Sequence, residues 1–300
     1  MAVDVNLLAQ FAPNSADLVN NDPEIYVNWL GLKTDANMFN NVANLKGKVM
    51  PDLPSGGDGV YGGYYEYASF LTAVKDRADH NRFAAVELGA GWGPWISGAG
   101  VVCLREGVRD ITLIGVEADK GKCQMMSDHL ARNGLAEDDG VKSRVIHGAA
   151  WKEDTTLQFP VIDSVRDHGA AATDKSDRVD YRGFSSDFVS VPAFSIETIC
   201  NGLDLIDYMH WDIQGAELEV AQTSIHFLNE KVSHLFVGTH SRYIEGNLID
   251  LFFRNGWDVL YQLPCAFRYN REKPSLEGMT ISDGEIFLRN PSVGVERTSR

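Results

Sequence analysis

The sequence predicts an α/β protein built on a doubly wound, Rossmann-like sheet, and three observations support this. From Arg82 to Asn255, short apolar runs alternate with stretches of helical periodicity, which is typical of parallel strands joined by crossover helices. A glycine-rich turn at Gly89 follows the first apolar run, where such folds bind ligands. The last two apolar runs are joined by a long polar loop, so we expect a hairpin and a mostly parallel sheet with an antiparallel last strand.

The expected elements follow one another from residue 82. We expect strands over residues 82–88, 111–117, 144–149, 205–213, 234–239, 257–263 and 284–289. Helices are expected between them over residues 94–107, 119–134, 194–200, 216–228 and 247–255. Pro94 and Gly107 bound the first helix, in keeping with the preference for proline early and glycine late. Asp119 is placed to cap the second.

Two parts of the chain lie outside this alternation. Residues 1–80 are expected to form a mainly helical front segment, interrupted by stretches rich in asparagine, proline and glycine. Residues 81–300 then form the Rossmann-like domain. Within it, residues 152–187 are polar and rich in turn residues, so we expect an insertion there. A loop of this length in a compact domain is usually functional or mobile.

Composition narrows the classes of partner. The 300 residues include 27 basic and 42 acidic side chains, a formal net charge of −15. Phosphate backbones and anionic lipids would repel such a chain, so we expect a small-molecule substrate, with no nucleic acid and no membrane as partner. No apolar run is long enough to span a membrane, and no secretory signal precedes the first elements, which predicts a cytoplasmic protein. The sequence leaves a homo-oligomer open.

The four cysteines are far apart in the sequence, at positions 103, 123, 200 and 265. They form no CxxC pair, so a zinc site is not expected. Most of them lie in apolar, helix-like surroundings. Buried free thiols in a reducing compartment are therefore the favoured interpretation.

The turn after the first strand is the most informative motif. Residues 87–93 read Glu-Leu-Gly-Ala-Gly-Trp-Gly, a G-x-G-x-G spacing that differs from the dinucleotide pattern G-x-G-x-x-G. A dinucleotide needs a helix N-terminus free to hold a pyrophosphate, and the Glu87 carboxylate would oppose that anion. Glu87 instead suits a cationic group, such as the α-ammonium of an amino acid. Pro94 also removes one N–H group from the helix start.

A second carboxylate stands at the end of the next strand. Glu117 follows Gly89 by 28 residues, and an acid there is placed to accept hydrogen bonds from two ribose hydroxyls. A ribose and an ammonium group without a phosphate site describe S-adenosylmethionine. Ala149, at the end of the third strand, is small enough for an adenine ring to lie against it. The remaining expected cofactor contacts are Gly89, Ala90, Gly91, Trp92 and Ala118.

The tip of the fourth strand carries further polar residues. Asp212 is a carboxylate at the end of a buried strand, which is costly unless it is paired or used, so we expect it at both the cofactor and the catalytic centre. Gln214 is expected to face the substrate. Glu217 falls in the first helical turn and is interpreted as a structural helix-start acid. His210 lies deeper on the same face and is interpreted as a core histidine with satisfied hydrogen bonds.

The fifth strand ends with His240 and Arg242 at the same edge of the sheet. A neutral His240 could take a proton from a hydroxyl. We therefore expect His240 or Asp212 to be the general base, the other orienting it or the acceptor. Arg242 could bind a substrate carboxylate or pair with Glu245. No metal is expected, because Asp212 and His240 have no evident third ligand.

Together these motifs resemble the FkbM family of S-adenosylmethionine-dependent methyltransferases, over about residues 60–291. The matching segments are residues 87–93, 116–119, 207–217, 239–242, 256–257 and 283–291. The family's usual form has Val and Glu where this chain has Ile213 and Gln214. The resemblance implies a seven-stranded methyltransferase sheet and O-methylation of sugar or polyketide hydroxyls. It also implies that Glu87, Gly89 and Gly91 hold the amino-acid end of the cofactor and that Glu117 holds the ribose.

Other interpretations stay open at this point. Residues 59–67 contain glycines and tyrosines, so Tyr64 and Glu66 could belong to a lid that faces the substrate, or the aromatic rings could simply pack in the core. An NAD(P)-dependent oxidoreductase is the alternative enzyme class, disfavoured by the glycine spacing and by Glu87. A non-catalytic protein that binds S-adenosylmethionine is the second alternative.

Overall fold

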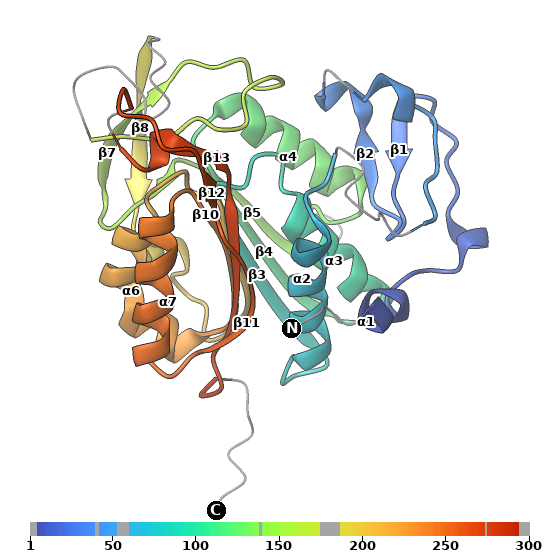
Figure 1. Ribbon diagram of the computed structural model, residues 1–300. Helices are drawn as coiled ribbons and strands as arrows, with labels where there is room; N and C mark the ends of the chain where they lie inside the picture. Colours follow the sequence, from blue (N-terminus) through green and yellow to red (C-terminus); the bar gives the residue numbers. More distant parts are fainter. Residues whose placement is uncertain are drawn as a thin grey trace, which may run out of the picture.

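A computed structural model describes residues 5–39, 42–52, 60–137, 140–174, 187–273 and 275–293. Its centre is a seven-stranded sheet with helices on both faces (Figure 1). In spatial order the strands are β11 (Asp258–Leu263), β14 (Gly284–Arg289), β10 (Val232–Thr239), β9 (Ile206–Trp211), β3 (Arg82–Leu88), β4 (Asp110–Glu117) and β5 (Lys142–His147). The chain therefore has the Rossmann-like α/β fold that the sequence predicts.

The direction of the strands also agrees with the prediction. The neighbours from β10 to β5 run parallel, whereas β14 pairs antiparallel with both β10 and β11. The last strand is thus the antiparallel one, and β11 and β14 form the expected hairpin. Because the parallel strands end at the same edge, the turns after Leu88, Glu117, Trp211 and Thr239 converge there.

The helices begin where local capping allows. Helix α3 (Pro94–Arg105) starts with a proline after Gly93, whose φ of 71° is left-handed. Asp119 caps α4 (Lys120–Arg132) by accepting a hydrogen bond of 2.8 Å from the Lys122 N–H. Helix α7 (Arg242–Arg254) begins five residues earlier than expected, because the Ser241 hydroxyl caps it.

The two faces of the sheet are covered by different helices. Helices α2 (Tyr64–Asp76), α3 and α4 share one apolar core on the first face, and α5 (Ile196–Ile199), α6 (Glu217–Lys231) and α7 share another on the second. Each core buries large side chains, among them Phe70 on the first face and Phe252 on the second. Burial of such a side chain contributes about 1.5–3 kcal/mol to the free energy of folding. The two helix layers therefore hold the strands of the sheet in place.

The front segment is less helical than the sequence predicts. It contains α1 (Val5–Gln10), the antiparallel strands β1 (Ile25–Val27) and β2 (Lys33–Asp35), and the short 3₁₀ helices η1 (Ser15–Asp17), η2 (Ala36–Met38) and η3 (Ala43–Leu45). The cause is local competition, because side-chain amides and carboxylates satisfy the backbone in turns. Asn28, for example, accepts hydrogen bonds of 3.0 Å from the N–H groups of Leu30 and Leu32.

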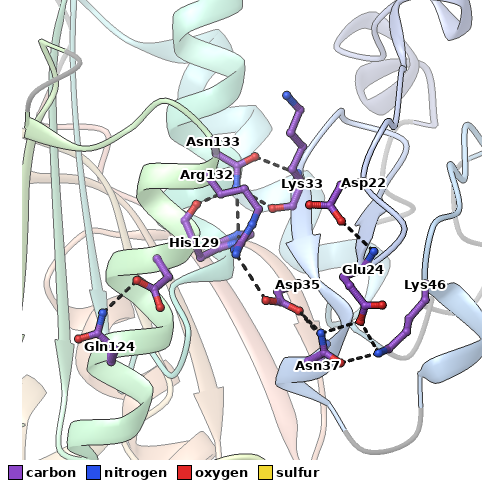
Figure 2. A network of polar contacts seen from close by, with 11 residues as sticks. Asp22, Glu24, Lys33, Asp35, Asn37, Lys46, Gln124, His129, Arg132 and Asn133 are labelled. Carbon is purple, nitrogen blue, oxygen red and sulfur yellow. Dashed lines mark hydrogen bonds and ion pairs between the residues drawn. The ribbon is translucent and has the colours of Figure 1, made fainter.

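This front segment packs on the domain that follows it. Trp29 and Leu30 are buried in the same core as Phe70 and Trp95. At the surface, the Asn133 side chain exchanges two hydrogen bonds, of 2.9 and 3.0 Å, with the backbone of Lys33 (Figure 2). The hairpin is therefore held against the end of α4 through the backbone of β2.

Two small sheets complete the fold. One contains β6 (Ala149–Ala150), β8 (Phe188–Phe194) and β7 (Thr155–Pro160), and the other contains β12 (Ala266–Phe267) and β13 (Thr280–Ser282), next to η5 (Glu277–Met279). The expected insertion at 152–187 thus includes a strand, while its residues 175–186 lie outside the described part. Within the described ranges, no helix is both long and apolar enough to cross a membrane.

Candidate functional site

The glycine-rich turn brings two strand tips together. Gly89, Gly91 and Gly93 all have left-handed φ angles, of 67°, 55° and 71°. A Cβ atom on Gly89 would lie 1.8 Å from the backbone oxygen of Asp212, so only glycine allows this close approach. A Cβ atom on Gly91 would instead enter open space. The turn therefore contacts the tip of β9 on one side and leaves room for a ligand on the other.

Glu117 holds this turn against β4. Its Oε2 atom accepts a hydrogen bond of 2.8 Å from the Gly91 N–H, and its Oε1 atom accepts one of 2.7 Å from the Asp119 N–H. Burial raises the pKa of the carboxyl group, which is almost inaccessible to solvent. A carboxylate oxygen has two lone pairs, so both atoms can still accept a ligand hydroxyl.

Glu87 has a structural contact that its expected ammonium-binding role did not include. Its Oε2 atom accepts hydrogen bonds from the N–H groups of Trp95, at 3.2 Å, and Ile96, at 2.9 Å. The carboxylate thus satisfies the first turn of α3, where Pro94 supplies no N–H group. Burial raises the pKa of Glu87 well above its usual range. The residue nevertheless lines the cavity described next.

The first cavity lies over the tips of β3, β4 and β9, with a volume of about 920 Å³ including open space. All nine of the predicted cofactor residues line it, and these are Glu87, Gly89, Ala90, Gly91, Trp92, Glu117, Ala118, Ala149 and Asp212. Gln214 and His210 line it as well.

Sequence reasoning missed the residues that cover this cavity from the insertion. Phe159, His168 and the alanines at 170–172 line it, although nothing in their spacing indicates a ligand. Lys122 also lines the cavity, and its ammonium group donates a hydrogen bond of 2.6 Å to the backbone oxygen of Asp167. The unusual length of this insertion was the sequence feature that could have indicated a role in the site. The described part of the insertion is therefore a wall of the site.

His240 lies between two carboxylates, which corrects the neutral state expected for it. Its Nε2 atom is 3.2 Å from Oδ1 of Asp212, and its Nδ1 atom is 2.8 Å from Oε1 of Glu217. Burial alone would lower the pKa of His240, but Glu217 and Asp212 outweigh it and raise the pKa well above the usual range. The two flanking carboxylates therefore favour the protonated imidazolium form, which is a poor acceptor for a further proton.

Glu217 does more than the expected helix-start role. Both of its carboxylate oxygens accept hydrogen bonds of 3.1 Å from the Gly215 N–H, as that role requires. The same side chain has no solvent exposure and pairs with His240. The position of Glu217 in the first helical turn predicted its contact with the backbone at the helix start. Its pairing with a histidine just after the end of β10 could not be read from that position.

Asp212 is positioned by its neighbours. Its backbone N–H donates a hydrogen bond of 2.9 Å to Leu88, and its Oδ1 atom also accepts one of 2.5 Å from the Gln214 amide. Burial would raise the pKa of Asp212, but the hydrogen bond from His240 outweighs it and the pKa is lowered. Gln214 has a left-handed φ of 53°, a costly conformation for a residue with a side chain. The turn thus aims Gln214 at Asp212.

His210 is not the satisfied core histidine that the sequence suggests. The residue is 3% exposed, and its ring stacks on Phe236 with centroids 5.0 Å apart. Neither ring nitrogen has a hydrogen-bond partner within the described part of the chain. The nearest carboxylate oxygen is Oε1 of Glu66, 3.6 Å from Nε2. A buried polar group without a partner is costly, and this one lines a cavity from which a ligand or a water molecule could satisfy it.

A second cavity adjoins the first. Its lining consists of Glu66, His210, Asp212, Phe236, Gly238, His240, Asp283, Gly284 and Glu285. His210 and Asp212 line both cavities, so the two meet at these side chains. Among the described residues, no group of three or more His, Cys, Asp or Glu side chains is arranged to hold a metal ion.

The structure separates some of the predicted residues from this site. Arg242 is exposed, lies outside the lining of both cavities, and donates a hydrogen bond to the backbone oxygen of Cys265. Glu245 does not pair with it but accepts hydrogen bonds from the side chain of Gln262 and the Cys265 N–H.

Of the residues expected in a lid, some line the site and others do not. Tyr61 is buried against Trp92, with ring centroids 4.9 Å apart, and Tyr64 packs against the same core. Neither tyrosine lines either cavity, whereas Glu66 lines the second. The four cysteines are all buried and free.

Comparison with known proteins adds the following. No protein-family model matches the chain. A protein of Jannaschia sp. (strain CCS1), described as "Putative methyltransferase", is 24% identical over 274 residues, which cover 90% of this chain and 94% of the relative.

Similar solved structures include precorrin-6y C5,15-methyltransferase from Geobacter metallireducens, 8% identical with a TM-score of 0.38 over 78% of this chain and 92% of that one. Ribosomal protein L11 methylase from Lactobacillus delbrueckii subsp. bulgaricus is also 8% identical, with a TM-score of 0.37 over 81% and 86% of the two chains. The chain is thus similar over most of its length to a protein described as a methyltransferase, and its own sheet order makes it an α/β protein of Rossmann-like fold.

Proposed function

We propose that the chain is an S-adenosylmethionine-dependent methyltransferase that acts on a hydroxyl group of a small molecule. One observation carries the proposal. A cavity built on the glycine-rich turn and Glu117 meets a second, polar cavity at His210 and Asp212. The Jannaschia relative supports the methyltransferase class. The resemblance to the FkbM family supports a hydroxyl acceptor.

The residues of the first cavity fit this cofactor. Glu117 keeps lone pairs for ribose hydroxyls, and the space beside Gly91 lets a ligand approach the backbone closely. Ala149 lines the cavity, and its small side chain leaves space for an adenine ring. The carboxylates of Glu87 and Asp212 suit the positive charges of the cofactor's amino-acid and sulfonium groups. They would oppose the pyrophosphate of a dinucleotide.

The chemistry divides between the cofactor and the chain. Bound S-adenosylmethionine would supply an activated methyl group, with its sulfur as the leaving group. Asp212 takes the proton that the hydroxyl loses, because it is a carboxylate at the junction of the two cavities. His240 is charged, so it positions Asp212 rather than acting as the base. The chain aligns the reactants and excludes water.

A small acceptor agrees with the charge of the chain. The net charge of −15 disfavours a polyanion such as RNA or DNA. The second cavity adds to this, because its lining contains four carboxylates and neither lysine nor arginine. A nucleic acid strand would meet negative potential at the mouth of the site.

Calorimetry tests the cofactor class. We expect S-adenosylhomocysteine to bind with measurable heat and NAD⁺ to give none. The reverse result would favour an NAD-dependent oxidoreductase and contradict the proposal. Methyl transfer from labelled S-adenosylmethionine to a panel of hydroxyl compounds tests the reaction. Cofactor binding with no transfer to any hydroxyl compound would favour a non-catalytic binding protein, and methylation of nitrogen alone would contradict the hydroxyl acceptor.

A further inference from the structure

The lining of the second cavity is strongly acidic. Glu66, Asp283 and Glu285 line it beyond the junction with the first cavity. The lining contains two histidines but neither lysine nor arginine. The charge of His240 is already balanced by Asp212 and Glu217, at 3.2 and 2.8 Å. The other three carboxylates therefore give the cavity an excess of negative charge.

Two of these carboxylates, Glu285 and Asp283, are harder to ionise than usual. Burial, and secondarily the nearby Glu66, raise the pKa of Glu285 to about 7. Burial also raises the pKa of Asp283. The Oε2 atom of Glu285 is buried without a hydrogen-bond partner in the described part of the chain. A cation in the cavity would relieve both the charge repulsion and the missing contact.

A second observation points to a polar ligand at the same place. His210 is 3% exposed, lines the cavity, and has no hydrogen-bond partner for either ring nitrogen within the described ranges. A ligand hydroxyl at the junction could satisfy one of these nitrogens. The stacked rings of His210 and Phe236 also form an aromatic wall, and such walls attract organic cations.

We propose that the second cavity binds the methyl acceptor, and that this acceptor is a hydroxyl compound carrying a positively charged nitrogen. The hydroxyl lies at His210 and Asp212, and the charged nitrogen lies between Glu66 and Glu285. This inference rests on the proposed methyltransferase function, and it adds the chemical class of the substrate. The cation is organic, because the described carboxylates and histidines are not grouped as metal ligands.

Matched small molecules test the charge requirement. Choline and 3,3-dimethylbutan-1-ol have nearly the same shape and the same hydroxyl, but only choline is charged, and 2-aminoethanol adds a smaller cation. Binding of each is measured by ligand-detected NMR to the full chain saturated with S-adenosylhomocysteine. We expect at least one cation to bind about tenfold or more tightly than the neutral alcohol, as for a ligand charge that meets a partly buried carboxylate.

Two variants locate the cation. Glu66→Gln and Glu285→Gln each remove one carboxylate of the second cavity, and neither residue lines the first. Glu230→Gln is the matched control, because Glu230 is exposed near the end of α6, at the opposite edge of the sheet. We expect each cavity variant to weaken cation binding about tenfold and the control to leave it unchanged. Unchanged affinity for S-adenosylhomocysteine shows that a variant is folded.

The outcomes separate this inference from the proposed function. If S-adenosylhomocysteine does not bind the unaltered chain, the proposed function is wrong. If it binds, but the neutral alcohol binds as tightly as both cations or no probe binds, the acceptor inference alone is wrong. Cation binding that survives in both cavity variants would place the cation elsewhere and would also overturn the inference.

Discussion

The Nδ1 atom of His240 lies 2.8 Å from Oε1 of Glu217, a carboxylate without solvent exposure. This contact decides the charge of the site. A buried carboxylate needs a cationic partner, and an imidazole held between two carboxylates needs a proton on each nitrogen. The pair therefore fixes His240 as a double donor, with Nε2 directed at Asp212. His240 orients the carboxylate that faces both cavities.

Replacing Glu217 by glutamine should release this arrangement. We expect the Glu217→Gln change to lower the pKa of His240, because burial lowers it and only Asp212 then opposes that effect. Breaking a buried ion pair costs about 3–5 kcal/mol, so the free energy of unfolding should also fall. NMR titration of the imidazole and urea unfolding measure the two effects. Glu219→Gln, on the exposed side of the same helical turn, is the control. An unchanged His240 pKa in Glu217→Gln would contradict the assignment.

Gly91 allows a test of the cofactor cavity that separates strain from obstruction. In both Gly91 and Gly107 the backbone is left-handed, with φ of 55° and 78°, and an added Cβ atom would meet nothing within 4 Å. Alanine at either position should therefore cost a similar amount of stability, about 1 kcal/mol. Only Gly91 lines the cavity. We expect calorimetry to show weaker binding of S-adenosylhomocysteine in Gly91→Ala alone, and equal weakening in Gly107→Ala would refute this placement.

The attachment of the front hairpin can be tested at Asn133. Its side chain exchanges two hydrogen bonds with the backbone of Lys33, at the surface of the protein (Figure 2). Asn133→Ala should lower the free energy of unfolding by about 1–2 kcal/mol, since each such bond contributes about 0.5–1.5 kcal/mol. Affinity for S-adenosylhomocysteine should not change, because Asn133 lies outside both cavities. Loss of cofactor affinity would mean that the hairpin supports the site.

The parts of the structure that depend on local pattern could be predicted from the sequence. Alternating apolar runs gave the strands of the sheet, and β3 has the expected bounds. The glycine spacing predicted a ligand-binding turn at Gly89, and the position of Glu117 at a strand end predicted a second contact. Both residues line the first cavity. The local sequence was enough to place each residue at the end of a strand. The carboxyl ends of parallel strands share one edge of the sheet, so these residues had to lie close together.

The parts that depend on contacts between distant segments could not be predicted. Glu217 and His240 are 23 residues apart, and only the packing of α6 beside β10 brings them together. The period of a strand showed that His210 faces inward, but not that its ring nitrogens would lack partners. In the front segment, the Asn28 amide donates a hydrogen bond of 3.2 Å to the Tyr67 hydroxyl, 39 residues further along the chain, which no local pattern indicates.

The pKa of Glu285 predicts how stability should vary with pH. Its value of about 7 in the folded chain lies above the roughly 4.3 of an unfolded chain, so the folded state holds this proton more tightly. The wild type should therefore lose stability at this site as pH rises from about 4 to 7, and the full cost remains at higher pH. Glu285→Gln removes the cost. Because the side chain is only partly buried, we expect the variant to gain about 1–2 kcal/mol over the wild type at pH 8 and little at pH 4.5. Urea unfolding across this range measures the difference, with Glu230→Gln as the control. A gain that is independent of pH would show that Glu285 is ionised throughout.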